Sequence, residues 1–231
     1  MGCNIMTVSY RRLSALFFDF DGVILESADI KTAAFEALFA SVPEHLPQIV
    51  SLHRRLGGVS RYEKFSMIHR DILRVPFSDA ERIMLGERFS ALIADALRFC
   101  PMVPGVLMAL ETLQRYKIPF FVVSGTPQEE LEELCAQRDL TRFFVEIHGS
   151  PRTKIEILSD ILARFGLRAT ETAMIGDAMT DYEAARAVGA RFIGRRKCPE
   201  ISPFPLGTMV LDDFFELENA LFDEEHCIPK R

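Results

Sequence analysis

The segment Leu16-Phe17-Phe18-Asp19-Phe20-Asp21-Gly22 most strongly limits what this chain can fold into. An apolar run that ends at a polar turn is typical of a parallel strand covered on both faces. Because an isolated ionised carboxylate is costly to bury, Asp19 and Asp21 are expected at the carboxyl end of the strand, where a metal ion or hydrogen-bond donors compensate them. Gly22 allows the sharp turn of an anion-binding backbone. The alternative is an ordinary Asp-Gly turn.

Composition narrows the class of protein. The chain has 231 residues, 48% of them hydrophobic and 26% charged, as in globular proteins. Its formal net charge of −6 argues against a nucleic-acid partner, which requires clustered positive charge. No apolar run is long enough to span a bilayer, and no signal-peptide core precedes Arg11-Arg12. We therefore predict a cytoplasmic protein. The cysteines are scattered without a Cys-x-x-Cys pair, which favours reduced thiols: Cys3, Cys100, Cys135, Cys198 and Cys227.

Residues 27–98 carry helical rather than strand periodicity. Apolar residues recur at helical spacing in several short segments, such as Ile30, Ala34 and Leu38. The segment 78–81 is a capping box that opens a longer helix with apolar positions at Ile83, Phe89, Ile93 and Leu97. The sequence therefore predicts a compact helical insert.

Strands and helices alternate after this insert. We predict buried strands at 118–123, 143–147, 172–175 and 191–193, an edge strand at 208–211, and helices near 106–116, 129–138, 154–165, 182–188 and 214–221. Repeated units of this kind form a parallel sheet with helices on both faces. The predicted fold class is α/β: a Rossmann-like doubly wound parallel sheet in residues 1–26 and 99–231, an inserted α-helical cap in 27–98, and a frayed tail after Asp223.

Polar clusters follow two of these strands, where ligands of such sheets bind. Ser124, Gly125 and Thr126 offer a hydroxyl and backbone N–H groups to a phosphate, although a simple helix N-cap would look the same. Lys154 could reach the same anion as a point charge, or lie on the surface, and Arg152 stays an alternative to it.

The last cluster contains Asp177 and Asp181. Asp177 at the strand end could bind a cation directly, whereas Asp181 could bind through water or orient Lys154. The alternative is an N-capping aspartate with a solvated partner. Oxygen-only ligation with few carboxylates suits Mg²⁺ better than Zn²⁺.

Together these clusters resemble the haloacid dehalogenase-like superfamily over most of the chain. The residues that carry the resemblance are Asp19-Phe20-Asp21-Gly22, Ser124-Gly125-Thr126, Lys154 and Gly176-Asp177-x-x-x-Asp181. The insert resembles the helical cap of the phosphoglycolate phosphatase and β-phosphoglucomutase branch. The spacing around Lys154 departs from the family's usual Lys-Pro-x-Pro pattern.

The resemblance implies a role for each residue. Asp19 would attack phosphorus and become an aspartyl-phosphate, and Asp21 would be the general acid and base. Mg²⁺ would be held by Asp19, the Asp21 carbonyl, Asp177 and waters, with Asp181 beside it. The groups that would bind the phosphoryl oxygens are Ser124, Lys154 and backbone N–H groups near Gly22 and Gly125.

Substrate choice is assigned to the cap. Residues 56–61 resemble the cap loop of β-phosphoglucomutases, which suggests that Arg61, assisted by Lys31 or Lys64, meets a polar or anionic part of the substrate. The alternative is that Arg61 and Lys64 are surface charges. The histidines of the insert are expected to be half-buried helix residues rather than metal ligands: His45, His53 and His69.

Three departures weaken the mutase alternative. Where mutases of this branch carry Asp and His near the cap hinge, this chain has Glu26 and Lys31, and Gly57 replaces a lysine of the cap loop. We therefore predict a Mg²⁺-dependent phosphatase of a small phosphorylated metabolite, as a monomer or homodimer. The alternatives are a sugar-phosphate mutase and, less favoured because Asp19 and Asp21 are both present, a non-catalytic sensor of a phosphorylated ligand.

Overall fold

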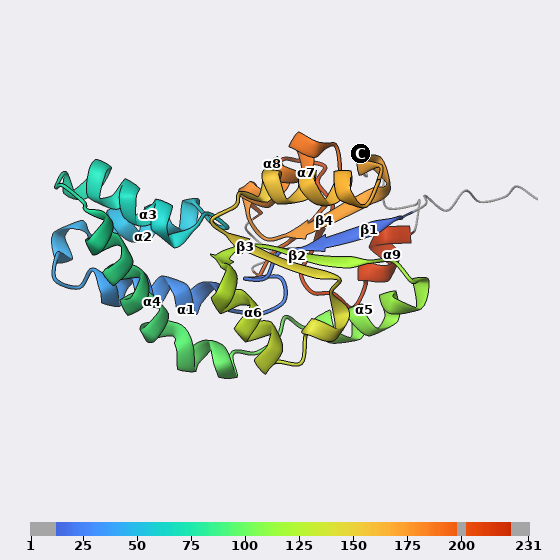
Figure 1. Cartoon of the computed structure of the whole chain (residues 1–231), viewed down its shortest axis with the longest axis horizontal. Coiled ribbons are helices and arrows are strands. Elements are labelled where there is room, and N and C mark those ends of the chain that lie inside the picture. The colour runs from blue at the N-terminus through green and yellow to red at the C-terminus, as the bar shows by residue number, and fades with distance from the viewer. Residues whose placement is uncertain (1–12, 198–201, 223–231) are drawn as a thin grey trace, which may run out of the picture.

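The computed structural model describes residues 13–197 and 202–222 (Figure 1). Cys3, Cys198, Cys227 and the tail predicted to fray after Asp223 lie outside these residues. Cys100 and Cys135 are buried free thiols. Within the described part, no helix combines the length and apolar character needed to cross a membrane.

A six-stranded parallel sheet forms the centre of the fold, in the order β3-β2-β1-β4-β5-β6. The strands are β1 (Ala15–Phe18), β2 (Phe120–Pro127), β3 (Glu146–Ser150), β4 (Thr172–Gly176), β5 (Arg191–Arg195) and β6 (Val210–Leu211). This confirms the predicted α/β class. The strand order reverses at β1, which pairs with β2 on one side and β4 on the other. Ligands of such sheets bind outside the strand ends at this reversal.

Apolar side chains cover both faces of the sheet. Phe17 of β1 stacks on Phe121 of β2 with ring centroids 5.4 Å apart, in a cluster with side chains of α7 (Lys154–Arg164) and α8 (Met179–Val188). The neighbouring residues Leu16 and Phe18 face the other side, where α5 (Val106–Leu113), α6 (Gln128–Gln137) and α9 (Leu217–Phe222) lie (Figure 1). Alternate strand residues point to opposite faces, so β1 is apolar throughout.

The helices of the insert lie beyond the end of the sheet that carries the carboxyl ends of the strands (Figure 1). They are α1 (Ala28–Leu38), α2 (Leu46–Arg55), α3 (Arg61–Met67) and α4 (Asp79–Phe99), with a π-helical turn at Ile68–Leu73. Short 3-10 turns occur at Pro43–His45, Gln114–Tyr116, Thr141–Phe143 and Ala169–Glu171. The insert has its own aromatic core, in which Phe35 contacts Phe65 and Phe89 at centroid distances of 5.6 and 5.0 Å.

Two adjacent linkers join the insert to the sheet. The first follows β1 and the second precedes α5, and they pair through Glu26 N to Pro101 O and Val103 N to Ile24 O, both 3.0 Å. Because the first linker leaves the sheet at the carboxyl end of β1 and the second runs beside it, the insert is held over the predicted site.

Two differences from the predicted elements bear on function. β2 continues to Pro127, which pairs with Ser150 of β3, so Ser124 lies inside the strand rather than at a helix start. In α4 the capping box at Ser78 is confirmed, but Ile83 is 54% exposed because that turn points away from the aromatic core.

Candidate active site

Carboxylates from two strands meet at the reversal of the sheet. Asp19 follows β1, and Asp177 and Asp181 follow β4. One carboxylate oxygen from each of the three lies within 4.8 Å of the others. The structure therefore brings together residues that are separated by more than 150 positions in the sequence.

Gly22 makes room for this cluster. Its backbone has a φ of +71°, and a Cβ atom built on it would lie 1.9 Å from Oδ2 of Asp177. The Gly22 N–H donates to the Leu25 carbonyl at 2.7 Å, so this donor is used within the turn. Gly22 therefore allows Asp177 to approach. The sequence predicts that N–H groups near Gly22 bind a phosphate, but the N–H of Gly22 itself is bonded to Leu25.

Lys154 links the two carboxylates on either side of it. Its Nζ lies 3.0 Å from Asp19 Oδ2 and 2.5 Å from Asp181 Oδ1, and all three side chains are buried. Asp181 also accepts the Ala178 N–H at 3.1 Å, so both of its oxygens are engaged. Arg152 is exposed and pairs with Asp160 at 3.2 Å. Of the two basic residues considered from the sequence, Lys154 is the one that reaches the cluster.

The electrostatics of the cluster fit a divalent cation. Burial and the facing charge of Asp181 raise the pKa of Asp19 to about 7, although Lys154 opposes the shift. Burial and the charge of Asp19 raise the pKa of Asp177 well above its usual range. A cation among these oxygens would favour their ionised forms. The donors are all oxygens, as Mg²⁺ prefers, and Asp19 and Asp177 are better placed as direct ligands than Asp181.

Asp21 is held by three partners. Its carboxylate accepts hydrogen bonds from Ser27 Oγ at 2.5 Å, Thr126 Oγ1 at 2.9 Å and Lys31 Nζ at 2.5 Å. Burial alone would raise the pKa of Asp21, but Lys31 and the hydroxyl donors lower it to about 2. The sequence did not predict the Ser27 and Thr126 contacts, because no local motif pairs these hydroxyls with Asp21, and Thr126 lies 105 residues away in the chain.

Ser124 and Gly125 lie directly under the insert. Ser124 is buried, and its Oγ accepts the Thr126 N–H at 3.2 Å. A Cβ atom on Gly125 would lie 2.3 Å from the Gly58 carbonyl oxygen. Gly125 thus permits close approach of the insert loop 56–60.

This loop is fitted to the core at several points. Thr180 Oγ1 donates to the Gly57 carbonyl at 2.8 Å, and a Cβ atom on Gly57 would lie 2.9 Å from the Cβ of Ala178. A Cβ atom on Gly58 would lie 3.0 Å from Nζ of Lys154. The loop therefore covers the Lys154 ammonium, and its glycines leave the space that this requires.

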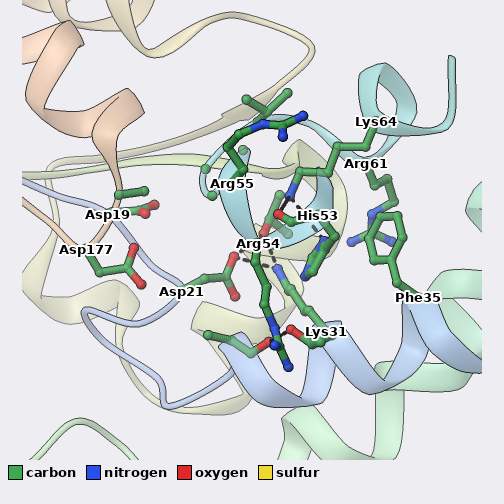
Figure 2. Close-up of a pocket in the computed structure, with 18 of the residues that line it drawn as sticks. Asp19, Asp21, Lys31, Phe35, His53, Arg54, Arg55, Arg61, Lys64 and Asp177 are labelled. Carbon is green, nitrogen blue, oxygen red and sulfur yellow. Dashed lines mark hydrogen bonds and ion pairs between the residues drawn. The ribbon is translucent and has the colours of Figure 1, made fainter. Parts of the chain in front are cut away.

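A cavity of about 500 Å³ lies between the core and the insert (Figure 2). Asp19, Asp21 and Asp177 lie on one side of it, and His53, Lys64, Arg61 and Phe35 on the other (Figure 2).

Arg61 is not a free substrate-binding group in this arrangement. It is 5% exposed, donates to Glu130 of α6 at 2.6 Å and to Ser90 of α4 at 2.7 Å, and lies 4.5 Å from the centre of the Phe89 ring. Lys31 is likewise paired, with Asp21. The sequence missed Glu130 and Ser90, which lie on helices distant from Arg61 in the chain.

Comparison with known proteins identifies the family to which the chain belongs. The family model of haloacid dehalogenase-like hydrolases matches residues 13–189, and the chain belongs to that family. A phosphorylated carbohydrates phosphatase from Thermotoga maritima is 24% identical over 188 residues, 77% of this chain and 82% of the relative. A phosphoglycolate phosphatase from Pseudomonas syringae pv. syringae is 23% identical over 220 residues, 90% of this chain and 79% of the relative.

Solved structures share the fold. The β-phosphoglucomutase of Clostridium difficile superimposes with a TM-score of 0.72 at 18% identity, covering 92% of this chain and 98% of that one. The predicted enzyme class, a haloacid dehalogenase-like phosphatase, is confirmed.

Proposed function

We propose that this protein hydrolyses a small phosphomonoester in a Mg²⁺-dependent reaction that passes through a phosphorylated Asp19. The observation that supports this most directly is the convergence of Asp19, Asp177 and the Lys154–Asp181 pair at the end of β1. When bound among the carboxylates, Mg²⁺ supplies charge neutralisation on the phosphoryl oxygens.

Each residue has a defined task in this reaction. An oxygen of Asp19 attacks phosphorus, and the leaving alcohol oxygen takes a proton through Asp21, whose carboxylate is hydrogen-bonded to the Lys31 ammonium as the proton source. Asp21 then takes a proton from the water that attacks the same phosphorus, which releases phosphate and restores Asp19. Ser124 and Lys154 hold the phosphoryl oxygens. Ser27, Thr126 and Lys31 keep the Asp21 carboxyl in one orientation.

The insert acts as a cap in this proposal. Its loop 56–60 lies over Lys154 and Gly125, so a substrate held beneath it is shielded from water. The cavity between cap and core suits a small metabolite. Relatives named for phosphoglycolate and for phosphorylated carbohydrates support that size range.

Phosphoryl transfer between sugar positions is less well supported. Glu26 is paired with Arg195, and Lys31 with Asp21, so neither is free to serve a second sugar phosphate. Gly57 abuts Ala178, which leaves no space for a side chain there. The likeness to the mutase concerns the fold alone.

The test is phosphate release from a panel of phosphomonoesters with and without Mg²⁺. We expect Asp19→Asn and Asp177→Asn to lower kcat by roughly a thousandfold or more, as for loss of a nucleophile or of its electrostatic partner. Asp160→Asn on α7 is the matched control, because Asp160 pairs with Arg152 and Arg164 outside the site, and should leave kcat unchanged. Turnover by Asp19→Asn at the wild-type rate would contradict the proposal.

A further inference from the structure

The outer face of α4 carries large apolar side chains that the rest of the described chain leaves exposed. Met84 is 49% exposed, Leu92 48% and Phe99 79%. The opposite face of the helix is buried in the insert through residues such as Phe89 and Ile93. Single exposed apolar residues are common in soluble proteins, but a helix normally places polar residues along its outer face. Several apolar residues in one line indicate a surface for a partner.

Six exposed residues form this line, which we call the α4 stripe. It consists of Met84, Arg88, Ala91, Leu92, Asp95 and Phe99. At roughly 100° per residue, the six positions fall within about 100° of the helix circumference. The stripe is about 22 Å long, at about 1.5 Å per residue. It is therefore a narrow, straight surface on a single helix.

The order of side chains along the α4 stripe is complementary to itself. Arg88 and Asp95 are equally far from the point between Ala91 and Leu92. If two copies of α4 pack antiparallel about a two-fold axis through that point, Arg88 of one copy meets Asp95 of the other, and this contact occurs twice. A parallel arrangement in the same register would instead place Arg88 against Arg88.

The apolar ends of the stripe match in the same way. Met84 and Phe99 are also equally far from the midpoint, so each would meet the other in the second copy. A thioether beside an aromatic ring is a favourable contact. The centre of the interface would be formed by Leu92 of one copy against the small Ala91 of the other, which allows the two helices to approach closely.

Arg88 and Asp95 are available for this contact. Neither has an ion pair or a side-chain hydrogen bond with another residue in the ranges that the structure describes, 13–197 and 202–222. By contrast, Arg82 near the start of the same helix pairs with Asp79 at 3.1 Å. Opposite charges within an otherwise apolar seam set the orientation and register of a helix pair.

We propose that the α4 stripe is the interface of a homodimer, in which α4 packs antiparallel against α4 of a second copy of this chain. Figure 1 shows α4 on the insert, at the opposite end of the molecule from the start of β1 and from α9. Phe89 of α4 lines the cavity over the active site and lies on the buried face of the helix. The two copies would therefore meet behind the wall of the cavity.

The mass of the whole protein in solution tests the proposal. A helix pair of this length gives a smaller interface than the usual one of about 1,600 Å², so we expect a weak dimer with a micromolar dissociation constant. Sedimentation equilibrium over roughly 1 to 300 µM protein should show a shift from monomer to dimer. A protein that stays monomeric over this range, or that forms only larger assemblies, would overturn the proposal.

Leu92→Glu should weaken the dimer. It places two like charges close to the two-fold axis, so the dissociation constant should rise by roughly thirtyfold or more, as for loss of a central contact. Ile83→Glu is the matched control, because Ile83 is 54% exposed on the same helix but points about 100° away from Met84, outside the stripe. It should dimerise as the wild type does.

Both side chains are exposed, so neither substitution should disturb the fold, and thermal melting followed by circular dichroism checks this. A dimer that persists in Leu92→Glu, or that is lost equally in Ile83→Glu, would place the interface elsewhere and overturn the proposal.

Charge reversals test the antiparallel register. Arg88→Glu or Asp95→Arg alone brings like charges together at both symmetric contacts, so each should raise the dissociation constant by roughly tenfold or more. An equimolar mixture of the two variants should associate again. In a mixed dimer the introduced glutamate faces the introduced arginine, and the unchanged Asp95 faces the unchanged Arg88.

A fluorescent label on one variant allows sedimentation velocity to detect the mixed dimer. We expect the mixture to associate roughly tenfold or more tightly than either variant alone. A mixture that associates no better than the single variants would overturn the antiparallel pairing of α4.

Discussion

Gly22 lies where any side chain would disturb the arrangement of the site. The positive φ of +71° disfavours any other residue, and the 1.9 Å approach of Asp177 excludes even a methyl group. Backbone strain and a steric clash therefore coincide at Gly22. Gly166 separates them, because it has a φ of +61° but nothing within 4 Å of the position of a Cβ atom, so a substitution there causes strain without a clash.

Gly22→Ala should displace Asp177 and lower kcat/KM by roughly a hundredfold or more, since a misplaced catalytic group costs about that much. It should also raise the Mg²⁺ concentration needed for half-maximal activity. Gly166→Ala carries the same kind of backbone strain, about 1 kcal/mol, without the clash. It should lower the melting temperature and leave kcat/KM unchanged. Equal activity of the two variants would refute the role given to Gly22.

Lys64 gives a prediction for stability against pH. Its pKa falls from 10.5 when unfolded to about 7 in the fold, so the unfolded chain binds the extra proton between these values. The cost of burying the charge is fully present below pH 7 and disappears as the pH rises toward 10.5. Lys64→Met should therefore be more stable than wild type at pH 6.5 by up to about 5 kcal/mol, because one pKa unit corresponds to about 1.4 kcal/mol.

The gap should shrink steadily between pH 7 and pH 9.5 in urea denaturation of the two proteins without substrate. Lys117→Met serves as the reference, because its side chain is exposed and should show no such trend. A gap that stays constant or widens with pH would show that Lys64 is not a buried, uncompensated cation.

At the scale of elements, α3 and α4 of the insert are tied to α6 of the core. Arg61 of α3 donates hydrogen bonds to Ser90 of α4 and to Glu130 of α6. The pair is largely buried, so removing one partner leaves an unpaired charge, which typically costs 3–5 kcal/mol. This cost falls on the closed arrangement, because an open insert would expose Arg61 to water.

Glu130→Gln should therefore favour an open insert and raise KM by roughly tenfold or more, the equivalent of about 1.4 kcal/mol. Small-angle scattering should show a larger radius of gyration than for wild type. Glu133→Gln is the matched control on the same helix, since Glu133 is exposed and contacts Gln137. If both variants keep the wild-type KM, the tie does not hold the insert closed.

The elements also show how far the sequence predicts this protein. The alternation of strands and helices, and the aspartates at strand ends, follow from local patterns, so the sheet, Asp19 and Asp177 were found. The contact of Arg61 with Glu130, 69 residues away, depends on how the insert is set on the core, and that of Asp21 with Thr126, 105 residues away, depends on the pairing of β1 with β2. No periodicity or motif encodes that placement. The sequence pattern therefore leaves Arg61 as either a substrate contact or a surface charge and does not predict its pairing with Glu130.

At the scale of the whole molecule, the proposed cation site lies between two halves of the sheet. Asp19 follows β1 and Asp177 follows β4, and both have raised pKa values because they are buried and also face like charges. A ligand that binds only the folded state stabilises it. Mg²⁺ should therefore raise the melting temperature, and a chelator should reverse the gain.

Asp177→Asn distinguishes stabilisation by Mg²⁺ bound at this site from a general effect of salt on the melting temperature. The substitution removes one of the facing charges, so the metal-free variant should melt at or above the wild-type temperature and should no longer respond to Mg²⁺. Asp160→Asn should respond as wild type does. A Mg²⁺-induced gain that persists in Asp177→Asn would place the cation elsewhere.

Covalent labelling of the working enzyme tests the central claim most directly. The Mg²⁺-loaded protein would be mixed with its best phosphomonoester, quenched in acid within milliseconds and analysed by peptide mass spectrometry. We predict one phosphoryl group on the peptide that contains Asp19, released by hydroxylamine and absent from Asp19→Asn. Full turnover without that label, or a label on another residue, would contradict the account.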